Sequence, residues 1–131
     1  MNHAPPDFIA DTSVIIRLFR RDSQVEEKVR GKKFAITFVT LAELDLGILK
    51  ASDQLAAVQR FAEVLVGVQV FHGSGRTPVL YARIYHDLEQ RGQKIPTNDI
   101  WIAAIALETN LPVLARDEHF SRVRGLPVIQ C

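Results

Sequence analysis

Residues 8–16, Phe-Ile-Ala-Asp-Thr-Ser-Val-Ile-Ile, place one acidic residue between two apolar runs of different character. The short run 8–10 is typical of a buried strand, and the apolar residues from Ser13 to Arg21 follow helical spacing. A buried strand that passes directly into a helix is typical of a parallel sheet covered by helices. Asp11 stands at the junction, where the carboxyl end of such a strand meets the start of the next helix.

The rest of the chain repeats this alternation of short apolar runs and helical patterns. We expect strands at Phe8–Ala10, Phe34–Phe38, Val68–Phe71, Val113–Ala115 and Val128–Gln130. We expect helices at Ser13–Arg21, Ser23–Arg30, Leu41–Ala51, Asp53–Val66, Thr77–Arg91 and Ile100–Thr109. Turns are expected at Gly31, Gly67, Gly73, Gly92 and Gly125. The order predicts a three-layer α/β/α sandwich with a central, mostly parallel sheet of roughly five strands, in a single domain spanning residues 1–131.

The composition excludes several classes of protein. A hydrophobic content of 47% predicts a folded core, and sixteen basic against fifteen acidic residues give a net charge of +1, which indicates no particular partner. The single cysteine, Cys131, excludes an internal disulfide and a cysteine-based zinc site. Because the chain also lacks a membrane-spanning run and residues 1–10 lack a signal-peptide pattern, we expect a cytoplasmic protein.

Three further acidic residues occupy positions similar to that of Asp11. Asp117 follows an apolar run, Asp99 starts an apolar helix, and Glu43 lies one turn into another helix. Because the carboxyl ends of parallel strands and the starts of the following helices share one edge, we expect the four carboxylates to converge. Such a group would repel itself strongly unless a cation lay within it. The pattern therefore predicts a site for a hard metal ion with oxygen ligands.

Two of these acids also have purely structural explanations. Asp is a favoured helix N-cap, so Asp11 could cap the helix that follows it, although Thr12 or Ser13 could do so without a charge. Glu43 fits a capping box with Thr40, in which the glutamate bonds back to the cap residue. We expect Thr12 and Ser13 to act as capping groups or to support the acidic site, and Glu43 to act partly through water.

The other two acids have competing explanations as well. Asp99 follows residues 96–98, Pro-Thr-Asn, which already hold more cap-competent groups than one helix start requires. An aspartate after a strand, such as Asp117, is common in turns. We expect Arg116 to form an ion pair with Asp117 rather than to bind substrate. We expect His119 to pack or hydrogen-bond beside its neighbours rather than to act as a general base.

Two helical stretches carry more apolar residues than one core-facing surface requires. The first helix has them around most of its circumference, and the pair of helices in residues 41–66 adds nine more. Core packing explains one face of each helix, and the excess predicts a buried interface, although an entirely internal role stays open.

Four segments in this order resemble the PIN-domain family and, within it, the small VapC-type ribonuclease toxins of bacterial toxin–antitoxin pairs. They are residues 9–13 (Ile-Ala-Asp-Thr-Ser), 40–44 (Thr-Leu-Ala-Glu-Leu) with Gly47, 95–99 (Ile-Pro-Thr-Asn-Asp) and 116–120 (Arg-Asp-Glu-His-Phe). The resemblance covers nearly the whole chain. It departs at Ala115, where members often carry a hydroxyl residue.

The resemblance implies an endoribonuclease that depends on Mg2+ or Mn2+ and leaves 5′-phosphate and 3′-hydroxyl ends. Asp11 and Asp99 would bind the first metal ion, and Glu43 and Asp117 would complete the site or orient water. It also implies a structured RNA target such as tRNA or rRNA, a homodimer, and a cognate antitoxin that neutralises the toxin and supplies the contact with operator DNA.

Three other interpretations differ in class. A phosphoacceptor receiver domain needs an acidic residue at the end of the third strand, where this chain has His72. A phosphatase of the Asp-x-Asp-x-Thr kind needs an acid at the position of Ser13. A PIN-like scaffold that binds protein partners without catalysis is the main alternative, and a chelator-sensitive nuclease assay would distinguish it.

Overall fold

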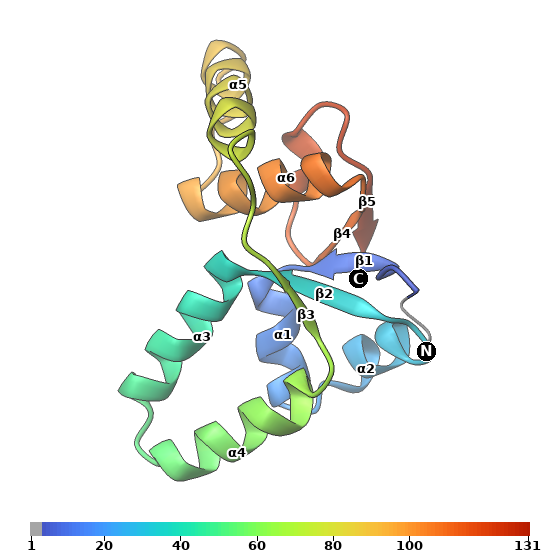
Figure 1. Cartoon of the computed structure of the whole chain (residues 1–131), viewed down its shortest axis with the longest axis vertical. Coiled ribbons are helices and arrows are strands. Elements are labelled where there is room, and N and C mark those ends of the chain that lie inside the picture. Colours follow the sequence, from blue (N-terminus) through green and yellow to red (C-terminus); the bar gives the residue numbers. More distant parts are fainter. Residues whose placement is uncertain (1–3) are drawn as a thin grey trace.

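A five-stranded sheet forms the centre of the protein, and helices cover both of its faces (Figure 1). The computed structural model describes residues 4–131. The strands are β1 (Phe8–Ala10), β2 (Phe34–Thr37), β3 (Gln69–Phe71), β4 (Val113–Ala115) and β5 (Val128–Gln130). They lie in the order β3-β2-β1-β4-β5, and every neighbouring pair is parallel. The expected α/β sandwich is confirmed, with a fully parallel sheet.

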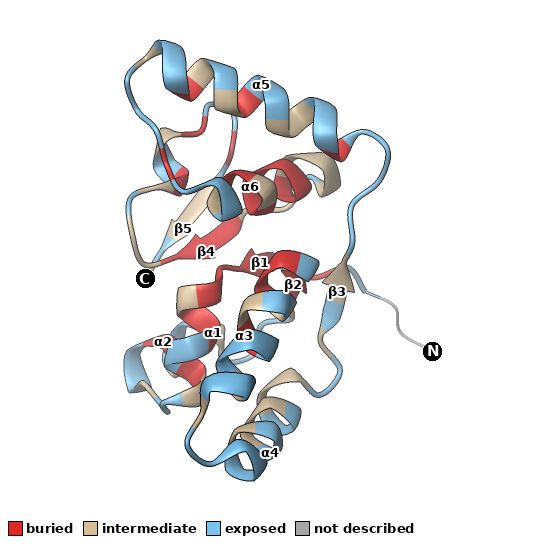
Figure 2. Ribbon diagram, turned by 90° about the vertical axis from the view of Figure 1, so that its left-hand side faces the viewer, coloured by how far each residue is buried: buried red, intermediate tan, exposed pale blue. Residues whose placement is uncertain are grey.

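The helices divide into two layers (Figure 1). They are α1 (Thr12–Phe19), α2 (Ser23–Val29), α3 (Phe38–Lys50), α4 (Gln54–Leu65), α5 (Thr77–Gln90), α6 (Thr97–Thr109) and the short 3-10 helix η1 (Phe120–Arg122). α5 and α6 lie on one side of the sheet, and α1 to α4 lie on the other (Figure 1). Each side has its own apolar core, and α6 is the most deeply buried helix (Figure 2).

The ends of the strands match the sequence expectations within one residue, but two helices begin three residues earlier than expected. α3 begins at Phe38 because Thr37 caps it: the Thr37 Oγ1 accepts a hydrogen bond from the N–H of Thr40 at 3.4 Å. α6 begins at Thr97, directly after Pro96, whose φ of −56° suits a helix start. Glu43 and Asp99 therefore lie inside these helices. The helix η1 was not expected from the sequence.

The expected glycine turns are confirmed, because all five glycines have positive φ. The turn at Gly73 matters most, since it leads into a clamp on α6. A Cβ at Gly73 would lie 2.6 Å from the Thr77 Oγ1. That hydroxyl donates to Glu108 of α6 at 2.5 Å, and Ser74 also bonds to Glu108. These bonds lower the pKa of Glu108 and fix the connection before α5 to the helix that carries Asp99.

α4 has no buried residue and is held to the rest of the protein mainly by its partly buried side (Figure 2). The Arg60 guanidinium donates to the carbonyl of Leu18 at 2.7 Å and to that of Phe19 at 3.1 Å, at the end of α1. A hollow of about 350 Å3 lies between these helices, with a mostly apolar lining from α1, α3 and α4 that also includes Glu43. Several of the excess apolar residues on the same three helices are exposed, namely Ile16, Leu46, Leu49, Leu55 and Val58.

No helix within residues 4–131 has the length and apolar character needed to cross a bilayer.

Candidate metal centre

Asp11 is the most buried acid of the site. It follows β1, is 3% exposed, and its backbone N–H donates to the carbonyl of Leu114 in the neighbouring strand at 3.0 Å. Its backbone occupies the N-cap position of α1, but its side chain makes no capping hydrogen bond. The carboxylate instead accepts a hydrogen bond from the Ser13 hydroxyl at 2.8 Å. Capping therefore does not account for this buried carboxylate.

The surroundings of Asp11 disfavour its ionised form. Burial, with a smaller contribution from the charges of Asp99 and Asp117, raises its pKa from an ordinary value of 3.8 to about 6, against the hydrogen bond from Ser13. A carboxylate from β1 is thus within electrostatic reach of two acids that lie some ninety and a hundred residues later in the chain. This is the convergence that the positions of the acids predict.

Asp99 lies in the first turn of α6, with a side chain that is 16% exposed. Its pKa is raised, first by burial and then by the charges of Asp117 and Glu43, while the hydrogen bond with His119 lowers it. All four predicted acids are therefore coupled to one another through Asp11 and Asp99. The helix N-terminus offsets part of the repulsion, because its dipole favours negative charge.

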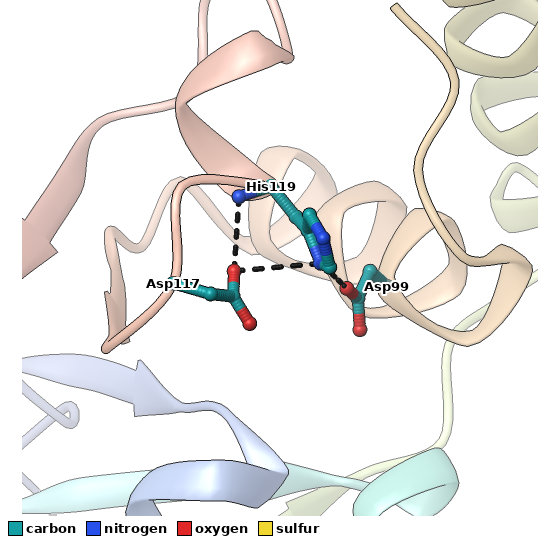
Figure 3. Close-up of side chains that lie close together, drawn as sticks. All are labelled: Asp99, Asp117 and His119. Carbon is teal, nitrogen blue, oxygen red and sulfur yellow. Dashed lines mark hydrogen bonds and ion pairs between the residues drawn. The ribbon is translucent and has the colours of Figure 1, made fainter.

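Asp117 and His119 face Asp99 from the segment that follows β4 (Figure 3). The His119 Nδ1 lies 2.9 Å from the Asp99 Oδ2 and 3.5 Å from the Asp117 Oδ1. The backbone N–H of His119 donates to the same Asp117 oxygen at 2.9 Å. One potential ligand atom from each of the three residues lies within 4.8 Å of the others. Because carboxylates accept, the hydrogen bond to Asp99 requires the proton on Nδ1.

His119 is a site residue that sequence reasoning did not assign to the metal. Its expected hydrogen-bonding role is confirmed, and its ring also stands where a metal ligand would. Its spacing of two residues from Asp117 is the one sequence signal that could have indicated this place. The carboxylate oxygens suit a hard divalent cation such as Mg2+ or Mn2+, whereas an imidazole ligand is more typical of softer transition metals.

Glu43 is positioned by a chain of hydroxyl groups rather than by a capping box. The Thr12 Oγ1 donates to the Glu43 Oε1 at 2.8 Å. Because the Thr12 proton is used there, the Thr40 Oγ1 donates to Thr12, also at 2.8 Å. The capping-box explanation was wrong, since Thr37 is the cap and Thr40 lies within α3. Thr12 and Ser13 support the acidic site, as expected, by binding Glu43 and Asp11.

The expected ion pair between Arg116 and Asp117 was also wrong. Within the part of the chain that the structure describes, Arg116 makes no ion pair, and its charge acts on Asp22 and on the thiol of Cys131. The charge of Asp117 acts on Asp11 and Asp99, whereas that of Arg116 acts on Asp22 at the N-cap of α2. Arg116 is thus available for another partner.

Gln130 is a second residue that sequence reasoning did not identify. Its side-chain amide donates to the carbonyls of Arg116 and Asp117, both at 2.9 Å. Because Gln130 pairs with Ala115 across β4 and β5, these bonds tie the Asp117 segment to the edge strand. Only the register of the two strands brings these residues together, and the sequence does not show that register.

We expect Gln130→Ala to weaken metal binding roughly tenfold, because groups that orient metal ligands typically contribute that much to affinity. Titration with Mn2+ by calorimetry measures the change. Gln90→Ala removes an exposed amide at the end of α5 and is the matched control. Equal Mn2+ affinity in the wild type and Gln130→Ala would show that the tether does not position the site.

Comparison with known proteins agrees with this fold. A family model described as the PIN domain matches residues 8–126. The chain therefore belongs to the PIN-domain family. Within that family its relatives are VapC-type ribonucleases. It is 31% identical to ribonuclease VapC5 of Mycobacterium tuberculosis, across 99% of this chain and 97% of that protein. It is also 31% identical to ribonuclease VapC4 of the same organism, across 92% and 94%.

Solved structures give the same result. A member of the VapBC family of toxin–antitoxin systems from M. tuberculosis, VapBC-5, matches with a TM-score of 0.78 and 31% identity, over 97% of this chain and 100% of that chain. VapBC2 of Rickettsia felis, bound to a DNA fragment from its promoter, matches with a TM-score of 0.87 over 94% and 97%. At 20% identity, this second similarity supports the fold alone.

Proposed function

We propose that this chain is a metal-dependent endoribonuclease toxin of a toxin–antitoxin pair, acting in the cytoplasm. The observation that carries the proposal is the convergence of Asp11, Glu43, Asp99 and Asp117 from four separate segments, with burial and mutual repulsion raising the pKa of two of them. A fold keeps such an arrangement at a cost to its own stability, which a bound cation offsets. The VapC ribonucleases among the relatives support RNA as the substrate.

In this proposal Asp11 and Asp99 hold a divalent cation, Mg2+ or Mn2+, and Asp117, Glu43 and His119 complete the site. A bound cation of this kind acts as a Lewis acid toward a phosphoryl oxygen and lowers the pKa of a bound water. Thr12 and Ser13 fix the rotamers of Glu43 and Asp11, so that these carboxylates need no rearrangement when substrate binds.

The carboxylates that do not hold the cation have a second role. Glu43 lies on the α3 side of the site, and Asp117 lies on the β4 side. Either can orient a water molecule for in-line attack on phosphorus and accept its proton. The bond from phosphorus to the 3′ oxygen then breaks, and the products carry 5′-phosphate and 3′-hydroxyl ends. No side chain forms a covalent bond with the substrate in this scheme.

The proposed partners are a structured RNA such as tRNA or rRNA, a cognate antitoxin and a second copy of the chain. The apolar hollow between α1, α3 and α4 includes Glu43 in its lining and therefore shares one residue with the acidic site. An antitoxin segment in that hollow would cover the site. The VapBC complexes among the structural relatives support such a partner. Contact with operator DNA would come through the antitoxin.

A chelator-controlled cleavage assay tests the proposal. We expect the purified chain to cleave structured RNA in the presence of Mg2+ or Mn2+. EDTA should stop the cleavage, and an excess of added Mn2+ should restore it. End labelling should find 5′-phosphate on the products. Cleavage that persists in EDTA would contradict a metal mechanism. A folded protein that binds an antitoxin but cleaves no RNA with either metal would favour the alternative, a PIN-like scaffold without catalysis.

A further inference from the structure

A second hollow lies on the α2 side of the sheet, beside the edge strand β5. It measures about 410 Å3, within the range of roughly 300–1,000 Å3 that is common for ligand pockets. Phe8, Leu114 and Ile129 line it from three neighbouring strands, and Lys28, Lys32 and Asp7 supply its polar groups. It shares no lining residue with the acidic site or with the hollow between α1, α3 and α4.

α2 links this hollow to the catalytic edge of the sheet. The N-cap of α2, Asp22, lies within electrostatic reach of Arg116, the residue before Asp117. The last turn of the helix carries Lys28, and Lys32 follows shortly after its end. Seven residues of helix span about 10 Å. That length can carry the phosphates of a short run of an RNA strand.

Cys131 lies at the point where the basic groups and the acidic site meet. Burial raises the pKa of its thiol, the charges of Arg116 and Lys28 lower it, and those of Asp22 and Asp11 raise it. The same thiol is therefore within electrostatic reach of a catalytic carboxylate and of two cations. Arg116 also directly precedes Asp117, and Lys28 shares the lining of the hollow with Leu114, whose carbonyl accepts a hydrogen bond from the Asp11 N–H.

The three cations along this path have no partner of their own. Among residues 4–131, the side chains of Arg116, Lys28 and Lys32 form no ion pair or hydrogen bond. Most of the acids on and beside α2 are already engaged: Glu27 pairs with Arg30, and within residues 4–131 only Glu26 of α2 has no side-chain hydrogen bond or ion pair. Asp22 caps α2 and lies 3.4 Å from Arg17, while Asp7 accepts from the backbone N–H of Lys33 at 2.8 Å. The surplus of positive charge suits a chain of phosphates.

We propose that the RNA strand leaves the acidic site past Arg116 and lies along α2, with its phosphates at Lys28 and Lys32 and one base in the hollow against Ile129. The inference rests on the proposed ribonuclease function and adds the path of the substrate. Lysine bonds to phosphates carry no sequence information, so this path contributes affinity and register and leaves the choice of cleavage sequence to other groups.

The double variant Lys28→Gln/Lys32→Gln tests the path. Cleavage is measured on a long single-stranded oligoribonucleotide and on a short one that holds only the nucleotides beside the cleaved bond. We expect KM for the long substrate to rise roughly tenfold while kcat and KM for the short substrate stay unchanged. Because the variant no longer neutralises two phosphates, the slope of log affinity against log salt should fall by roughly 1.4, at about 0.7 for each phosphate of a single strand.

A double variant with the same change in charge elsewhere is the control. Lys50 ends α3 and Arg83 lies on α5, and both are exposed. Lys50→Gln/Arg83→Gln should leave KM and the salt slope as in the wild type. The path is overturned if the Lys28→Gln/Lys32→Gln protein keeps the wild-type KM and salt slope. It is also overturned if the Lys28→Gln/Lys32→Gln protein binds the antitoxin more weakly but binds RNA as tightly as the wild type does. A wild-type protein that cleaves no RNA would instead refute the proposed function.

Discussion

Asp11→Asn is expected to lower RNA cleavage by a thousandfold or more, while the metal-free protein becomes more stable. A loss of that size corresponds to about 4 kcal/mol of transition-state stabilisation, as is typical when a preorganised electrostatic group is removed. Asparagine keeps the shape of the side chain and can still accept the Ser13 hydrogen bond. The charge that holds the cation is lost, together with its repulsion of Asp99 and Asp117.

The gain in stability follows from the same charge. The pKa of Asp11 is about 6 in the folded protein, against an ordinary value of 3.8. At about 1.4 kcal/mol for each pKa unit, ionised Asp11 therefore destabilises the metal-free fold near neutral pH by up to about 3 kcal/mol. Urea unfolding in EDTA measures this effect on stability, and single-turnover cleavage with Mg2+ measures the effect on activity. A carboxylate that served only as a structural cap would give the opposite result, with activity retained and stability lost.

Asp45→Asn is the matched control for both measurements. Asp45 is exposed on α3, two residues from Glu43, so its side chain points away from the acidic site. The same change of charge there should leave cleavage and metal-free stability close to the wild type. A comparable loss of activity in Asp45→Asn would show that net charge, rather than the site, controls cleavage.

The sequence identified the acids because each lies at, or within about a turn of, a point where the spacing of apolar residues changes between that of a strand and that of a helix. These junctions share one edge in a parallel sheet. The strands β1, β4 and β5 have the expected ends since turn-forming residues bound their apolar runs. The start of α3 was harder to predict. Thr37 and Thr40 are both good caps, and only the packing of the buried Thr40 against Thr12 selects the earlier start.

His119 and Gln130 could not be found in this way. His119 depends on the direction in which the chain leaves β4 before η1, and Gln130 depends on the pairing of β5 with β4. Neither residue lies at a change of period. Such supporting bonds arise from tertiary register, for which a single sequence gives no local signal. The misplaced ion pair of Arg116 has the same origin, because tertiary packing after β4 brings Asp117 beside His119 and leaves Arg116 within electrostatic reach of Asp22.

The stability of the metal-free protein should fall as the pH rises from about 4.5 to 7, and Mg2+ should remove most of this fall. The folded state holds the Asp11 proton up to a pKa of about 6, whereas the unfolded chain releases it near 3.8. Between these values the folded state binds more protons, so rising pH favours unfolding. The raised pKa of Asp99 acts in the same direction. Asp22, Asp87 and Glu108 have lowered pKa values, so the stability that they contribute is lost mainly below about pH 5, as the unfolded chain begins to bind their protons.

Urea unfolding at pH 4.5 and pH 7, in EDTA and in Mg2+, measures this effect. The wild type in EDTA should lose about 2 kcal/mol more than Asp11→Asn over this interval, because the difference between the two proteins isolates the Asp11 proton. Mg2+ binds the ionised carboxylates and not the protonated ones, so its stabilising effect should grow with pH in the wild type. Parallel curves for the two proteins in EDTA would mean that Asp11 ionises freely. The site would then have no electrostatic reason to bind a cation.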